Sequence, residues 1–232
     1  MKPVYSAGRD PEELLRGRKA IRSVFQSSQV RTFRELYGKR KKSLEVGCGY
    51  GFFTSLALET TDRLCCVDTE DYLAPSVKAS PNVEFKAASA LKLPYSDGQF
   101  DCVFSMDVIE HVEDGAAFLA ENLRVLKKSG TLILGTPNRN RLSAFIRKML
   151  FMPNRYPLVI KDRIFGTITH VREYSLKELS DLLKSFPGLK IEKFKPVYFG
   201  LTDPVNIGVP RPPFLFVDLC QFWLVSLVKT GP

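Results

Sequence analysis

Three glycines within five positions, Gly47, Gly49 and Gly51, follow directly after the apolar run at residues 43–46. A helical apolar pattern begins at Phe52, so the order is strand, glycine turn and helix. α/β folds use this order to bring a nucleotide against bare backbone at a helix N-terminus. The dinucleotide fingerprint G-x-G-x-x-G would require glycine where Phe52 stands, and no Gly-Lys-Ser/Thr sequence follows to bind a triphosphate. The turn therefore predicts a ligand of another kind.

Two carboxylates narrow the choice of ligand. Glu45 lies two residues before Gly47, where its charge repels a pyrophosphate and attracts an ammonium group. Asp68 ends the next apolar run, 21 residues after Gly47, where it can accept hydrogen bonds from both ribose hydroxyls. Taken singly, the glycines also fit a tight turn without a ligand, and Asp68 fits a helix cap. Together they favour a ligand with a nucleoside at one end and an amino acid at the other.

Apolar runs alternate with amphipathic stretches from residue 43 onwards, and this alternation predicts an α/β domain with a largely parallel sheet. We expect seven strands, at residues 43–46, 63–67, 83–86, 100–105, 131–135, 190–197 and 221–229. We expect helices at residues 52–59, 72–79, 115–127 and 175–186. The last strand is apolar on both faces, which suits a central position next to the strand at 190–197.

The chain of 232 residues reads as one domain. Asp10 followed by Pro11 indicates a helix start, from which a basic helical region runs towards Tyr37. We divide the domain into an N-terminal basic helical cap (1–42), a ligand-binding core (43–137), a lid insertion (138–170) and the C-terminal half of the sheet (171–232). The insertion is expected to be a helix and loop laid over the carboxyl edge of the sheet.

The net charge of +9 is concentrated in two stretches. Residues 16–42 hold ten basic residues against one acid, and residues 139–163 hold seven against one. These stretches fit solvated helix faces, and they also fit a surface that attracts an anionic substrate, a nucleic acid or a lipid membrane.

The five cysteines lie mostly inside apolar runs and do not follow the spacing of a disulfide framework. The adjacent Cys65 and Cys66 should point to opposite faces of a strand and serve as buried packing. No signal peptide opens the chain, and the longest apolar stretch, residues 214–228, is too short and too polar to span a bilayer. We therefore expect a cytoplasmic protein without a transmembrane segment.

Five stretches carry a family resemblance: "LEVGCGYGFFT", "CVDTE", "ALKLPYSDGQFDCVFSMDVIEHVED", "LKKSGTLILGTPN" and "HVREYSLKELSDLL". They resemble the successive motifs of class I S-adenosylmethionine-dependent methyltransferases, in particular the methyltransferase type 11 group that includes the ubiquinone-biosynthesis O-methyltransferases. The resemblance covers residues 43–229. It implies a Rossmann-like, seven-stranded, mostly parallel sheet with helices on both faces and an antiparallel last strand. It also implies S-adenosyl-L-methionine as cofactor and S-adenosyl-L-homocysteine as product.

The resemblance also assigns roles to single residues. Glu45 and the glycine turn would hold the methionyl end, Asp68 the ribose, and Ser89 with Ala90 the adenine edge. Family members often carry aspartate where this chain has Ser89, whose hydroxyl accepts a hydrogen bond from the adenine amino group more weakly. The expected cofactor-binding residues are Glu45, Gly47, Cys48, Gly49, Gly51, Asp68, Thr69, Ser89, Ala90 and Met106.

The stretch "SMDVIEHVED" lies just past the strand at 100–105, where open α/β sheets place their ligands. A sulfonium methyl group is already activated, so the protein mainly holds the acceptor in line and excludes water. His111 titrates nearest to neutral pH and could take a proton from a hydroxyl acceptor, so we predict it as the catalytic residue. The alternative is that "EHV" only caps the following helix and braces the cofactor loop.

A metal-assisted alternative stays open. Asp107, Glu110, His111 and the chain's other histidine, His170, resemble the arrangement of ubiquinone-biosynthesis and small-RNA 2′-O-methyltransferases, where a divalent metal helps to activate a hydroxyl. The first three converge only if the turn after the strand is helical, and "EHV" also occurs in metal-free relatives. We predict no metal ligand.

The acceptor should be shaped by the N-terminal helix, the basic insertion at 139–163 and the loop at 198–213. Aromatic residues among these basic side chains suggest an apolar pocket with a basic rim, or an aromatic seam that ties the lid to the core. They are Phe145, Phe151, Tyr156, Phe165, Tyr198 and Phe199. A pocket of this kind fits a small aromatic or lipid-like acceptor with negative charge.

We conclude that the sequence predicts methyl transfer by direct displacement to a small molecule, with oxygen favoured. The alternatives are an RNA 2′-O-methyltransferase, a cofactor-binding protein without turnover, a nicotinamide oxidoreductase, and a basic adaptor for RNA or anionic membrane.

Overall fold

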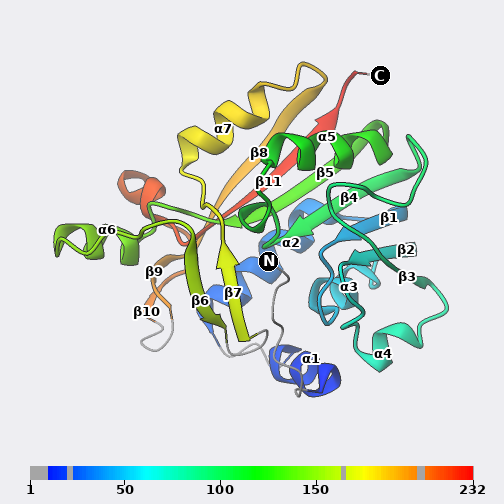
Figure 1. Cartoon of the computed structure of the whole chain (residues 1–232), viewed down its shortest axis with the longest axis horizontal. Coiled ribbons are helices and arrows are strands. Elements are labelled where there is room, and N and C mark those ends of the chain that lie inside the picture. Colours follow the sequence, from blue (N-terminus) through cyan, green and yellow to red (C-terminus); the bar gives the residue numbers. More distant parts are fainter. Residues whose placement is uncertain (1–9, 20–22, 163–165, 203–206, 232) are drawn as a thin grey trace.

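The computed structural model of the protein describes residues 10–19, 23–162, 166–202 and 207–231. Its centre is a seven-stranded sheet with the order β3-β2-β1-β4-β5-β11-β8 (Figure 1). The strands are β1 (Arg40–Val46), β2 (Thr61–Asp68), β3 (Val83–Ala87), β4 (Phe100–Met106), β5 (Leu126–Pro137), β8 (Leu189–Val197) and β11 (Phe222–Lys229). β11 lies antiparallel between β5 and β8, and the other pairs are parallel. The predicted seven strands and the central antiparallel last strand are therefore confirmed.

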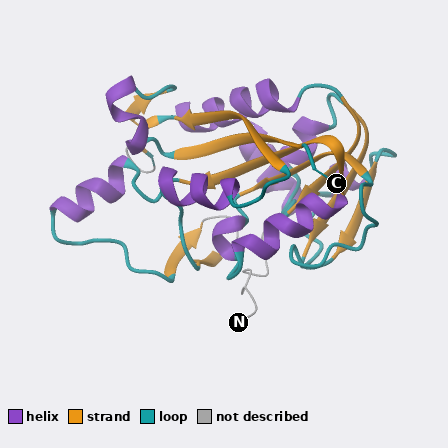
Figure 2. Ribbon diagram, turned by 90° about the horizontal axis from the view of Figure 1, so that it is seen from above, coloured by secondary structure: helices purple, strands orange, loops and turns teal. Residues whose placement is uncertain are grey.

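Helices cover both faces of this sheet, as Figure 2 shows. They are α1 (Pro11–Lys19), α2 (Val24–Tyr37), α3 (Phe52–Ala57), α4 (Pro75–Lys78), α5 (Gly115–Val125), α6 (Leu142–Met149) and α7 (Leu176–Lys184). One buried cluster joins α2, α3 and α4 to the sheet, with Phe33 packed against Phe53 and Phe104. A second cluster on the other face contains Phe118 of α5 and Trp223 of β11. The protein is therefore a three-layer α/β structure of the Rossmann-like type.

Side chains fix the starts of several helices. The hydroxyl of Ser23 accepts the amide of Gln26 at the start of α2, and Ser175 forms a capping box with Glu178 at the start of α7. The carboxylate of Asp114 accepts the amides of residues 116 and 117 at the start of α5. These caps explain where the three helices begin.

The cysteines are buried and free. Cys65 belongs to the buried cluster on one face of the sheet and Cys66 to the cluster on the other. The prediction of packing on opposite faces of a strand is confirmed.

Several boundaries differ from the sequence predictions. The helix expected at residues 72–79 is confined to α4, because Pro75 fits the first helical position and starts the helix there. The helix expected to end at residue 127 ends at Val125, because β5 already begins at Leu126.

The insertion after β5 contains more structure than the expected helix and loop. α6 is followed by an antiparallel hairpin of β6 (Leu158–Asp162) and β7 (Gly166–His170). A second small hairpin, β9 (Phe199–Leu201) with β10 (Ile207–Val209), and the 3-10 helix η2 (Phe214–Leu219) precede β11. None of the described helices has both the length and the apolar character needed to cross a bilayer.

Candidate active site

The glycine turn after β1 follows a path that side chains would obstruct. Gly47, Gly49 and Gly51 all have positive φ angles, of 80°, 50° and 91°. A Cβ on Gly47 would lie 2.2 Å from Cγ2 of Val108, and a Cβ on Gly51 would lie 2.8 Å from Cδ1 of Leu73. Gly47 and Gly51 are therefore required for two separate reasons, conformation and close approach, and Gly49 is favoured by its conformation.

Backbone hydrogen bonds tie the same turn to β2. The amides of Gly47 and Cys48 both donate to the carbonyl of Val67, at 2.7 and 3.2 Å. Cys48 is itself buried, and its thiol forms a hydrogen bond with the thiol of Cys66 that, with burial, raises its pKa. The predicted role of Cys48 thus rests on its backbone, since its side chain packs inward.

Glu45 is buried beneath the turn, where its carboxylate accepts the hydroxyl of Thr54 at 2.5 Å. Burial, with a smaller contribution from Cys66, raises the pKa of Glu45 well above its ordinary value. A buried carboxyl of this kind gains from a cationic partner, since an ammonium group would restore its ionised form. Thr54, on the first turn of α3, was missed in the sequence, although it lies on the helix that opens the glycine motif.

Asp68 ends β2 and is bound to the glycine turn. Its Oδ2 accepts the amide of Gly49 at 2.8 Å, and its Oδ1 accepts the amide of Thr69 at 2.7 Å. Burial raises the pKa of Asp68 against the effect of these two bonds. Each carboxylate oxygen keeps further acceptor capacity, so the pair of ribose hydroxyls can still be bound.

The remaining predicted cofactor residues lie on the neighbouring strands. Ser89 and Ala90 follow β3, whose end is joined to β2 because the amide of Ala88 donates to the carbonyl of Asp68. The hydroxyl of Ser89 is exposed and accepts the amide of Leu91 at 3.2 Å. Met106 ends β4 and is buried against Gly135 of β5. All predicted cofactor residues therefore lie at the carboxyl edge of four adjacent strands, β3, β2, β1 and β4.

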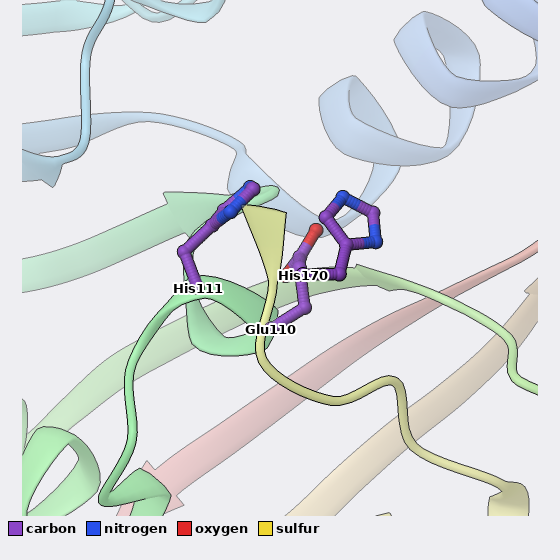
Figure 3. A group of neighbouring side chains, drawn as sticks. All are labelled: Glu110, His111 and His170. Atoms are coloured by element: carbon purple, nitrogen blue, oxygen red, sulfur yellow. The ribbon is translucent and has the colours of Figure 1, made fainter. Parts of the chain in front are cut away.

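A second group of side chains lies at the same edge, just beyond β4. Glu110 and His111 lie on the 3-10 turn η1 (Ile109–His111), and β7 ends at His170. One ligand atom from each of these three residues lies within 4.8 Å of the others (Figure 3). The rings of His111 and His170 are 4.7 Å apart and nearly perpendicular.

Hydrogen bonds define which nitrogen of each ring is available. Nδ1 of His111 lies 2.8 Å from the carbonyl oxygen of Thr169, which can only accept, so Nδ1 carries the proton. Burial lowers the pKa of His111 to about 4, which keeps its ring neutral at physiological pH and leaves the lone pair on Nε2. Nδ1 of His170 lies 2.9 Å from Oε1 of Glu173, so in the neutral ring of His170 Nε2 is again the free acceptor.

Glu110 is fully buried and only half satisfied. Its Oε2 accepts the hydroxyl of Thr136 at 3.0 Å, while Oε1 has no hydrogen-bond partner among the described residues. Burial, and next the charge of Asp107, raise the pKa of Glu110 well above its ordinary value. The sequence also suggested Asp107 as a metal ligand. In the described part of the chain, its carboxylate is not part of the group formed by Glu110, His111 and His170.

Glu173 holds His170 in place and was missed in the sequence. Its carboxylate accepts His170 Nδ1, the hydroxyl of Tyr156 at 2.8 Å, and the guanidinium of Arg141. Burial alone would raise the pKa of Glu173, but the bond from His170 and the charge of Arg141 lower it to about 2. The signal was present: an acid three residues after a histidine in "HVREYS".

The predicted aromatic pocket is not formed as expected. Phe151 is 94% exposed and Phe145 is 45% exposed, so neither lines a closed pocket. Tyr198 is buried in the core beneath Phe25, and Phe199 stacks on Phe216. Tyr156 alone among these aromatics joins the Glu173 group, and Phe165 lies outside the described residues.

Known proteins resemble the chain in both sequence and fold. The family model of a methyltransferase domain matches residues 44–134. A probable S-adenosylmethionine-dependent methyltransferase of Mycolicibacterium smegmatis is 31% identical over 68% of this chain and 55% of its own length. Another from Mycobacterium tuberculosis is 33% identical over 76% of this chain and 65% of its own length.

The chain belongs to the class I S-adenosylmethionine-dependent methyltransferases. The ubiquinone biosynthesis O-methyltransferase of Methylococcus capsulatus is 35% identical over 46% of the chain and 47% of its own length. In fold, the chain is similar to the N-methyltransferase NodS of Bradyrhizobium japonicum in complex with S-adenosylhomocysteine, with a TM-score of 0.60 and 14% identity, over 96% of this chain and 100% of NodS. The chain spans 55% and 65% of the two mycobacterial methyltransferases.

Asp68→Asn should weaken the binding of S-adenosylhomocysteine by about tenfold to a hundredfold, because a charged hydrogen-bond acceptor is lost, worth about 1.5–3 kcal/mol. Isothermal titration calorimetry measures the affinity. Asp62→Asn, at an exposed position on the same strand, serves as the matched control and should bind like the wild type. Equal affinity of all three proteins would show that Asp68 does not hold the ribose.

The carboxylate of Glu173 should make stability depend on pH in a defined direction. Its pKa in the folded chain, about 2, lies below the ordinary value of 4.5, so ionisation favours the folded state. The stabilisation is fully present above pH 4.5 and is lost as the pH falls towards 2, with a total of about 3 kcal/mol. Urea unfolding should show Glu173→Gln to be less stable than the wild type by about that amount at pH 7, shrinking to roughly two-fifths of it at pH 3.

The control for this measurement is Glu178→Gln, since the Glu178 side chain is 46% exposed and pairs with Arg139 at the surface. It should change the free energy of unfolding by less than about 1 kcal/mol. A loss in Glu173→Gln that stays constant from pH 7 to pH 3 would contradict the proposed ionised state.

Proposed function

We propose that the chain transfers a methyl group from S-adenosylmethionine to a hydroxyl oxygen of a small molecule by direct displacement. The observation that carries this proposal is the contact between the two groups of residues. Val108 packs against Gly47 of the cofactor turn and lies two residues before Glu110. The cofactor residues and the group of Glu110, His111 and His170 therefore share one continuous edge of the sheet.

The cofactor residues would act by binding and orientation. Glu45 and the glycine turn would bind the amino-acid end of the cofactor, and Asp68 would bind its ribose. Met106 would line the cofactor. Since the sulfonium methyl group is activated by its own charge, the remaining task is to hold the acceptor oxygen in line and exclude water.

His111 would accept the proton that the hydroxyl loses. Its Nε2 carries the lone pair, and the low pKa keeps it unprotonated at physiological pH, although it also makes the imidazole a weak base. We prefer oxygen because His111 can take up a proton beside the cofactor site. An unprotonated amine would not need such a base. The similarity to a ubiquinone biosynthesis O-methyltransferase supports the same acceptor atom.

The unpartnered oxygen of Glu110 favours a second candidate, a divalent cation held by Glu110, His111 and His170. The donors fit: one carboxylate and two imidazoles with free Nε2 atoms suit Mn²⁺, Fe²⁺ or Zn²⁺. Glu173 would orient His170, as carboxylates commonly do behind metal-binding histidines. Such a cation would supply a lowered pKa at an acceptor hydroxyl.

We extend this proposal to the kind of acceptor and to the cellular compartment. The basic insertion and N-terminal cap suit a small acceptor with negative charge, apolar or aromatic in its body. Free, buried cysteines suit a reducing compartment, and we place the chain in the cytoplasm. Family membership supports methyl transfer over the nicotinamide oxidoreductase and the non-catalytic adaptor.

Incubation with S-adenosylmethionine labelled in its methyl group and a cell extract tests the proposal. We expect label in the small-molecule fraction, attached to oxygen by mass spectrometry, and a strong reduction with Asp68→Asn. Label confined to the RNA fraction would contradict the small-molecule acceptor. Label on nitrogen would contradict the hydroxyl.

The two roles of His111 predict different results. As a base alone, His111→Asn should lower kcat by about 10²–10⁴ while chelators leave the wild type active. As a metal ligand, chelation should abolish activity, Mn²⁺ or Zn²⁺ should restore it, and His170→Asn should lose both activity and metal-induced thermal stabilisation. Full activity of His111→Asn in the presence of chelator would exclude both roles.

A further inference from the structure

The insertion after β5 exposes six large apolar side chains. They belong to α6 and the turn that follows it: Phe145, Ile146, Met149, Leu150, Phe151 and Met152. Leu150 is 65% exposed and Phe151 94% exposed. Phe151 also has a φ angle of 59°, a conformation that bulky residues rarely adopt. An exposed set of this size marks an interaction site, because single-chain proteins seldom leave such surface uncovered.

A second exposed apolar segment lies beside the first. Phe214 and Leu215 of η2 are 91% and 85% exposed. The two segments are linked through β9, which packs against α6 and carries Phe199, whose ring stacks on Phe216 of η2 at 5.4 Å. α6 and η2 lie at the same end of the molecule, and α6 extends beyond the sheet in both views (Figures 1 and 2). We call residues 145–152 and 214–216 the apolar tip.

Cations surround the apolar tip. Residues 139–155 contain five basic side chains and no acid, and Arg147, Lys148 and Arg155 are exposed. Arg211, just before η2, is also exposed. A second copy of the chain would bring the same cations into contact with these, and RNA would leave the phenylalanine, leucine and methionine side chains in water. An anionic bilayer accommodates both groups, because the apolar side chains enter the acyl boundary while the cations meet the headgroups.

We propose that the apolar tip binds the surface of an anionic phospholipid bilayer and holds the chain there without spanning it. The segment that carries α6 is well placed to orient the active site, because residues at both of its ends bind the same side chain. Arg141, directly before α6, and Tyr156, after the tip, both bind Glu173, which holds His170. This binding does not depend on the identity of the methyl acceptor, and it is measured in the absence of S-adenosylmethionine.

Co-sedimentation of the full chain with vesicles tests the proposal. We expect binding to vesicles of phosphatidylcholine mixed with phosphatidylglycerol, weakened by salt, and much weaker binding to phosphatidylcholine alone. The double variant Arg147→Gln/Lys148→Gln should lower the partition coefficient about 30-fold, because each basic residue near an anionic surface contributes about a fivefold gain. Phe151→Ser and Phe214→Ser should each lower it about tenfold.

The matched control is Lys184→Gln/Lys190→Gln, which removes two exposed cations where α7 ends and β8 begins, at the opposite edge of the sheet. It should bind vesicles within twofold of the wild type. All variants are at exposed positions, so unchanged melting temperatures and S-adenosylhomocysteine affinities confirm that they are folded.

Three results would overturn the proposal. The first is absence of binding to both kinds of vesicle, or equal binding to both. The second is a dimer in size-exclusion chromatography with light scattering that Phe151→Ser dissociates, which would assign the tip to a second copy. The third is binding to RNA that Arg147→Gln/Lys148→Gln abolishes and Phe214→Ser leaves unchanged, together with loss of vesicle binding only in the charge variant.

Discussion

The absence of a side chain at Gly47 determines how the two halves of the active site meet. Val108 occupies the space that a Cβ at this position would need, so the end of β4 can approach the end of β1 directly. The positive φ angle of Gly47 turns the chain towards β2 at the same point, where its amide bonds to Val67. Since η1 begins one residue after Val108, this approach also sets where Glu110 and His111 lie relative to the cofactor turn. The conformation of Gly47 thus sets how close the predicted cofactor turn lies to the group of Glu110 and His111.

Three buried carboxyls in the site fall into two groups according to their partners. Glu173 is fully compensated, by Arg141, His170 and Tyr156, and its pKa is low. Glu45 has one hydroxyl partner, and Glu110 has one on a single oxygen, and the pKa of each is raised. A buried carboxyl without a cation is costly, and proteins keep such groups where a ligand completes them. The pattern fits a positioning role for Glu173 and supports the proposed binding roles of Glu45 and Glu110.

Local sequence signals predicted the sheet and the cofactor turn, because both depend on short-range chemistry. Alternating apolar runs define the strands, and glycines at positions 47, 49 and 51 are required by backbone conformation that other residues resist. The hairpin of β6 and β7 escaped prediction because its strands are short and partly exposed, with Val159 62% exposed, and are stabilised by pairing with each other. The position of His170 beside His111 depends on that pairing, across 59 residues of sequence. The sequence around His111 could suggest that His111 and His170 lie together, but it could not establish this contact.

The exposed aromatics of the insertion show a further limit of sequence patterns. Phe145 and Phe151 look like pocket residues because aromatic side chains among cations usually gain from burial. The structure leaves them outside because the buried interactions of the insertion are made at its base, where Arg141 and Tyr156 meet Glu173, and by its hairpin, where Thr169 binds His111. The intervening segment is therefore fixed at both ends and has no core to enter. Both attachment points of this segment, Arg141 and Tyr156, are partners of the carboxylate that binds His170, so a surface bound by the apolar tip would be connected to His170 through Glu173.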